Sequence, residues 1–89
     1  MENEAMYAQA ILKWGLPFQY VKLAEESGEM LQAAAKVLLN KWNKNRLAEE
    51  IADLEIMLEQ VQVAYSIEEA VHKMKAKKLK RLEKRLLKD

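Results

Sequence analysis

The sequence predicts an all-α fold, a four-helix protomer whose core is completed by dimerisation. Only two glycines and one proline interrupt 89 residues. Alanine, leucine, glutamate, lysine and methionine dominate over valine and isoleucine, which favours helix over strand. Apolar residues recur at spacings of three and four. The length suits one domain spanning residues 1–89.

The first two helices are expected on either side of Gly15. The first runs from Asn3 to Trp14, and Gly15 is its stop signal. Leu16 and Pro17 form a tight connection. The second helix runs over 18–39, with Pro17 near its start, where a missing N–H costs little.

The polar segment 40–45 is expected to be a loop between the second and third helices. The third helix runs over 46–64, with an apolar stripe of Leu47, Ile51, Leu54, Leu58 and Val61. A capping box of Ser66 and Glu69 then begins a fourth helix that ends near Lys88. Its expected buried edge is Ile67, Val71, Met74, Leu79, Leu82 and Leu86.

The second helix is apolar around much of its circumference, so it needs cover on more than one side. A chain of 89 residues has little material for that cover. We therefore expect a homodimer or a tetramer.

Charge is divided unevenly along the chain. Residues 1–69 carry 6 basic and 12 acidic side chains, whereas residues 70–89 carry 9 basic and 2 acidic ones. The basic end has no interleaved aromatic residues, so nucleic-acid binding is not expected. The absence of cysteine excludes disulfides and thiolate sites. No signal peptide or membrane-spanning run is visible, so we expect a cytoplasmic protein that does not enter membranes.

Two acidic pairs mark a candidate metal site. Glu26 and Glu29 lie three residues apart in the second helix, and Glu50 and Asp53 do so in the third. Residues at this spacing share a helix face, and antiparallel helices would bring the pairs together. Clustered carboxylates among apolar neighbours need a counter-cation. An all-oxygen ligand set suits Mg²⁺, or alternatively Mn²⁺.

A simpler interpretation stays open for each charged group. The carboxylates could be solvated or paired with the basic fourth helix, and Lys22 could form an ordinary ion pair with Glu25 or Glu26. Trp14, Phe18 and Tyr20 could stack on a base or pack in the core or an interface. Trp42 could be a dimer contact or a lid.

The acidic residues resemble a known signature. Residues 22–29, followed by residues 50–53, are similar to the EExxE…ExxD pattern of the MazG-like all-α nucleoside triphosphate pyrophosphohydrolases. Residues 47–60 resemble the third helix of small members, and residues 78–82 their basic last helix. The resemblance implies a MazG-like bundle that cleaves an NTP or dNTP to the monophosphate and pyrophosphate.

The resemblance also implies roles for individual residues. Glu26, Glu29, Glu50 and Asp53 would bind the metal. Glu25 would orient the attacking water beside them, and Lys22, Lys78 and Arg81 would hold the substrate phosphates.

The sequence argues against a di-iron site and leaves one alternative function. Glu69 and His72 form a Glu-x-x-His, but a di-iron bundle needs two such motifs and His72 is the only histidine. The alternative function is a non-catalytic helical interaction module, either a degenerate family member or a phage accessory protein.

Overall fold

The computed structural model describes residues 2–39 and 43–88. They form four helices, α1 (Asn3–Trp14), α2 (Leu16–Leu38), α3 (Lys44–Tyr65) and α4 (Glu68–Leu87), and no strand occurs in this part of the chain. The predicted all-α, four-helix fold is confirmed. None of these helices is both long and apolar enough to cross a membrane, within the ranges described.

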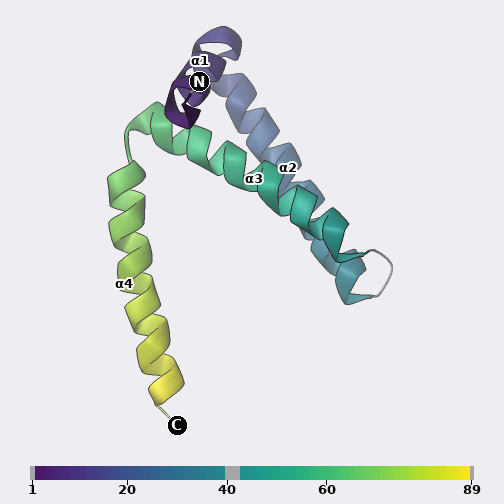
Figure 1. The fold of residues 1–89 in the computed structure, drawn as a ribbon, viewed down its shortest axis with the longest axis vertical. Helices are drawn as coiled ribbons and strands as arrows, with labels where there is room; N and C mark the ends of the chain where they lie inside the picture. Colours follow the sequence, from purple (N-terminus) through teal and green to yellow (C-terminus); the bar gives the residue numbers. More distant parts are fainter. Residues whose placement is uncertain (1, 40–42, 89) are drawn as a thin grey trace.

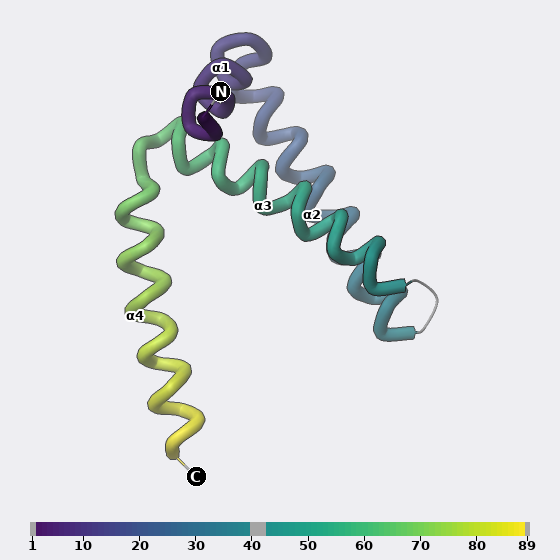
Figure 2. Tube along the Cα trace, viewed as in Figure 1, coloured from purple at the N-terminus to yellow at the C-terminus, as the bar shows by residue number. Residues whose placement is uncertain are grey.

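A hairpin of α2 and α3 is the centre of the fold. The two helices lie side by side and antiparallel, and α1 crosses the end of the hairpin where α2 begins and α3 ends (Figure 1). Helix α4 leaves that end and runs away from the other three (Figure 2). Among the described residues α4 contacts α3 alone, near the link between them.

The turn between α1 and α2 is tighter than expected. Gly15 has φ 84°, and its N–H donates to the carbonyl of Ile11, so one residue reverses the chain. The prediction that Leu16 and Pro17 form a connection is wrong, because both belong to the first turn of α2. A proline there sacrifices no helical hydrogen bond, since the first N–H groups of a helix have no partner.

Helix α3 begins two residues earlier than predicted. The Asn43 side chain accepts a hydrogen bond from the backbone N–H of Arg46 at 3.0 Å and caps the helix. Lys44 and Asn45 are therefore helical rather than part of the loop. The remaining loop residues, including Trp42, lie outside the described ranges.

The predicted capping box at the start of α4 is wrong. Ser66 adopts a left-handed conformation, φ 54° and ψ 44°, and terminates α3. Its N–H and that of Ile67 donate to the carbonyls of Val63 and Gln62, as in helix C-caps. With Ser66 used in this way, α4 begins after Ile67 without a side-chain cap.

The single chain has a small core. Ala33 and Met57 are the buried apolar residues in the described ranges, and Gln19, which lines a cavity with Met57, is buried as well. Met57, rather than the predicted Leu58, faces α2, and Ile51 is also exposed. The predicted buried edge of α4 is exposed as well, from Val71 at 36% to Leu86 at 76%, because no other helix in the described ranges covers it.

Replacing the cap of α3 tests its contribution to stability. Asn43→Ala removes the acceptor for the Arg46 N–H, and we expect the free energy of unfolding to fall by about 0.5–2 kcal/mol. Urea unfolding followed by circular dichroism measures the change. Asn45→Ala is the control, since that exposed residue lies inside the helix. An equal loss in both variants would contradict a capping role.

Candidate metal centre

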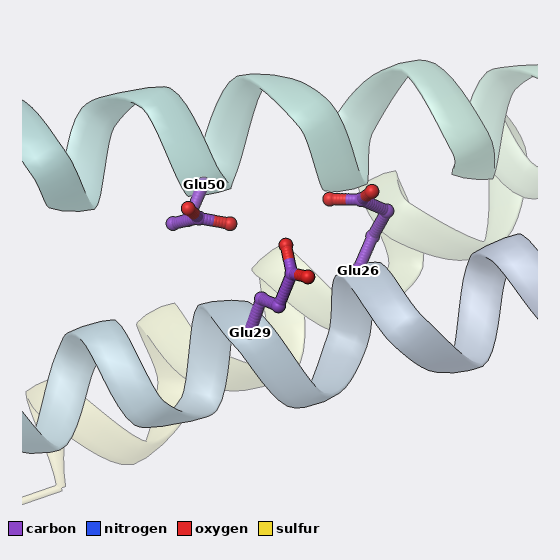
Figure 3. Close-up of side chains that lie close together, drawn as sticks. All are labelled: Glu26, Glu29 and Glu50. Carbon is purple, nitrogen blue, oxygen red and sulfur yellow. The ribbon is translucent and has the colours of Figure 1, made fainter.

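Three glutamates meet between α2 and α3. Glu26 and Glu29 point from α2 toward α3, and Glu50 points from α3 toward them (Figure 3). One carboxylate oxygen from each residue lies within 4.8 Å of the other two. The expectation that acidic side chains from both helices converge is met for these three residues.

The register of the hairpin explains the convergence. Glu29 lies nine residues before the end of α2, and Glu50 lies six residues after the start of α3. The offset of three residues corresponds to roughly 4.5 Å along a helix. A glutamate side chain spans that difference by leaning along the axis.

Two of the three carboxyl groups are partly removed from water. Glu26 and Glu50 are each half-buried, whereas Glu29 is exposed. The Oε2 atoms of Glu26 and Glu50 are buried, and neither has a hydrogen-bond partner. Buried acceptors without a donor are costly, and such costs are tolerated where a ligand supplies the missing interaction.

The same surroundings raise the pKa of both groups. Burial raises the pKa of Glu26 above its ordinary 4.5, and the charges of Glu29 and Asp53 raise it further. Burial also raises the pKa of Glu50, followed by the charge of Glu29 and a hydrogen bond with that residue. Both shifts disfavour the charged form, so a cation at this point would relieve the repulsion.

Asp53 lies near the cluster without joining it. Its charge raises the pKa of both Glu26 and Glu50, which places it within electrostatic reach. Its oxygens are not among those that approach within 4.8 Å of one another. The structure thus assembles three of the four predicted ligands, and direct ligation by Asp53 stays a prediction.

The donor set fits a hard divalent cation. All three groups offer carboxylate oxygens, and oxygens bound to opposite sides of Mg²⁺ are about 4.2 Å apart, given metal–oxygen distances of about 2.1 Å. The three oxygens lie within 4.8 Å of one another, a spacing of the same order. Mn²⁺ takes similar ligands.

Lys22 and Glu25 pair with each other on α2. The Lys22 Nζ donates to Glu25 Oε2 at 3.1 Å, and this hydrogen bond is the first cause of the raised Lys22 pKa. Both side chains are more than a third exposed, so the pair contributes little to stability. The ion-pair alternative for Lys22 is observed, and catalytic roles for Lys22 and Glu25 stay predictions.

The predicted phosphate ligands of α4 lie apart from the carboxylates. Lys78 and Arg81 are exposed, and α4 makes no contact with α2. One chain in this conformation does not bring them to Glu26 and Glu29.

A cavity beside the cluster contains residues that the sequence did not single out. It encloses about 350 Å³ and is lined by Trp14, Phe18, Gln19, Lys22, Met57 and Gln60. Gln19 is 3% exposed, and the Oε1 atoms of Gln19 and Gln60 are buried without hydrogen-bond partners. The sequence contained a signal for Gln19. This residue precedes Glu26 by two helical turns and therefore shares its helix face.

The aromatic residues near the start of α2 lie in two different places. The rings of Trp14 and Phe18 lie 6.2 Å apart at this cavity. Tyr20 instead pairs its hydroxyl with that of Tyr65 on α3. The three aromatic residues therefore do not share one surface.

The raised pKa values predict how stability depends on pH. A carboxyl whose pKa is higher in the folded than in the unfolded state stabilises the fold when protonated, and this contribution is lost as pH rises above about 4.5. We expect Glu26→Gln/Glu50→Gln to be more stable than the metal-free parent at pH 7, and the difference to shrink toward pH 4.5. Urea unfolding across this range measures it, with Glu55→Gln as the control. A variant less stable than the parent at pH 7 would contradict the prediction.

Comparison with known proteins adds no relative. No protein-family model matches the chain, and no curated protein and no solved structure matches it. The fold and the carboxylate geometry are therefore described from this chain itself, and the MazG-like resemblance stays a hypothesis based on the quoted motifs.

Proposed function

We propose that this protein is a Mg²⁺-dependent nucleoside triphosphate pyrophosphohydrolase of the MazG-like kind. The observation that carries the proposal is the convergence of Glu26, Glu29 and Glu50 between two helices, with two buried oxygens lacking partners. These residues occupy three of the four metal positions of the EExxE…ExxD signature. Neither a surface ion-pair network nor a structural core needs three carboxylates facing one another.

The chemistry of the site suits attack of water on the α-phosphorus. A bound Mg²⁺ would supply positive charge for the phosphates and lower the pKa of a bound water. Glu26, Glu29 and Glu50 would hold that ion, and Asp53 would complete its surroundings. Glu25 lies beside them on α2, where its carboxylate would accept a proton from water after exchanging its partner Lys22.

The neighbouring cavity is the natural place for the nucleobase. Trp14 and Phe18 offer ring faces, and the amides of Gln19 and Gln60 offer donors and acceptors to the edge of a base. Lys22 lies between this cavity and the carboxylates, one helical turn from Glu26. We infer that the phosphates extend from the base past Lys22 toward the cation.

Self-association belongs to the same proposal. The described part of the chain has two buried apolar residues and twenty exposed large hydrophobic residues. A stable domain buries a much larger share of its apolar side chains. We infer a homodimer or tetramer that covers part of this surface. Lys78 and Arg81 would reach the phosphates once α4 is brought to α2, by a second copy or by a movement of α4. We infer a cytoplasmic location, where nucleoside triphosphates occur.

Release of pyrophosphate tests the proposed reaction. With Mg²⁺ and a panel of NTPs and dNTPs, we expect at least one substrate to yield pyrophosphate and the monophosphate. Glu26→Ala, Glu50→Ala and Asp53→Ala should each lower kcat by at least about a hundredfold, as expected for loss of a metal-binding group. Glu55→Ala, an exposed change elsewhere on α3, should keep the activity.

The same assay separates the two functions. An inactive protein across the panel with Mg²⁺ and Mn²⁺, together with no rise in melting temperature with either ion, would favour the interaction module. Cation binding without hydrolysis would favour a degenerate family member.

Trp14→Ala tests the base cavity. Loss of stacking costs about 1–3 kcal/mol per base, so KM for the preferred nucleotide should rise about 5- to 100-fold while kcat changes little. Steady-state kinetics measure both constants. Leu12→Ala on the same helix is the matched control, because that leucine is 85% exposed and does not line the cavity. An unchanged KM in Trp14→Ala would contradict the assignment.

A further inference from the structure

Two glutamine side chains line the cavity beside the carboxylates. Gln19 comes from α2 and is 3% exposed, and Gln60 comes from α3 and is half-buried. The Oε1 atom of each is buried, and no described residue donates a hydrogen bond to either oxygen. Two buried acceptors at one cavity therefore lack donors, which a fold tolerates where a ligand supplies them.

The helix register places both amides at one level of the hairpin. Gln19 lies seven residues before Glu26 on α2, and Gln60 lies seven residues after Asp53 on α3. Because the two helices are antiparallel, both steps lead toward the end of the hairpin that α1 crosses (Figure 1). Seven residues are close to two helical turns, so each amide keeps the helix face of its carboxylate and lies roughly 10.5 Å farther along.

The space between the two levels suits the length of a nucleotide. Lys22 and Met57 line the cavity, and their positions in the chain fall between the amides and the carboxylates. The rings of Trp14 and Phe18 lie at the same cavity. A base that stacks on these rings can turn its edge toward the two amides, while its phosphates extend past Lys22 toward the carboxylates.

The missing donors select the edge of the base. An amide oxygen accepts hydrogen bonds and cannot donate them, so the two oxygens need two N–H groups from the ligand. One exocyclic amino group carries two N–H bonds, and cytosine and adenine present such a group at N4 and N6. Thymine and guanine present a carbonyl oxygen at the corresponding position, which would leave the two amide oxygens unpaired and facing a third acceptor.

We propose that Gln19 and Gln60 select nucleotides whose base is cytosine or adenine, each amide oxygen accepting one hydrogen bond from the exocyclic amino group. This inference rests on the proposed function, because it takes the cavity as the base site, and it adds the substrate class and the two residues that determine it. A site whose buried acceptors need N–H donors rejects a base without them more strongly than an apolar cavity does.

Binding of matched nucleotides tests the preference without hydrolysis. The α,β-methylene analogues of dCTP, dUTP, dATP and deoxyinosine triphosphate cannot be cleaved between the α- and β-phosphates, and each pair exchanges the amino group for a carbonyl oxygen. By calorimetric titration with Mg²⁺, we expect the parent to bind the dCTP and dATP analogues about 5- to 150-fold more tightly than their carbonyl counterparts, the discrimination of one bidentate base contact.

The outcomes separate this inference from the proposed hydrolysis. Equal affinities, or tighter binding of the carbonyl-bearing analogues, would overturn the inference and leave the hydrolysis to be judged by pyrophosphate release. The expected preference without pyrophosphate release from dCTP or dATP would overturn the hydrolysis alone. Failure to bind all four analogues would overturn the base cavity together with the inference.

Substitution of the amides tests their role. Gln19→Leu/Gln60→Leu removes both acceptors, so the preference should be lost while the dUTP analogue still binds. Gln60→Glu keeps its acceptor oxygens and should keep the preference. Gln32→Leu, at an exposed glutamine of α2, is the matched control, and circular dichroism checks the fold of each variant. Retention of the preference in the double variant, or its loss in Gln60→Glu or Gln32→Leu, would overturn the role of the two amides.

Discussion

Repulsion among carboxylates inside the α2–α3 hairpin is the constraint on which the rest of this structure depends. The hairpin is the largest helix contact in the chain, yet its interface contains Glu26 and Glu50 where apolar side chains would pack better. Each carboxyl retains a buried oxygen without a partner. A fold that places charge in its main interface loses stability there, and a bound cation would offset that loss.

The rest of the chain shows how little else stabilises one protomer. Ala33 and Met57 form the buried apolar core of the described residues, and α4 packs on no helix other than α3. Gly15 and Ser66, both with positive φ, set the directions of α2 and α4 with single residues. The directions of the helices are therefore set locally, whereas most of their large apolar side chains stay exposed in the single chain.

The candidate site and the open faces of α2 are linked by geometry. One side of α2 presents Gln19 and Glu26 to α3, and the other leaves Val21, Leu31 and Leu38 exposed. A helix paired on both sides is held against rotation about its axis. Such restraint would keep the carboxylates at one depth, which metal coordination demands.

Local chemistry in the sequence determined the helices and the shared face of Glu26 and Glu29. The scarcity of glycine and proline and the three-residue spacing of Glu26 and Glu29 are enough for both, because helix geometry converts spacing into a shared face. Three further features needed the tertiary structure. Asp53 stands outside the group of converging oxygens, Gln19 and Gln60 line a cavity, and Ser66 terminates α3 rather than capping α4. The first two features depend on the register and crossing of α2 and α3, which arise from contacts between helices that no single helix encodes. The third depends on the backbone conformation of one residue in the link between α3 and α4.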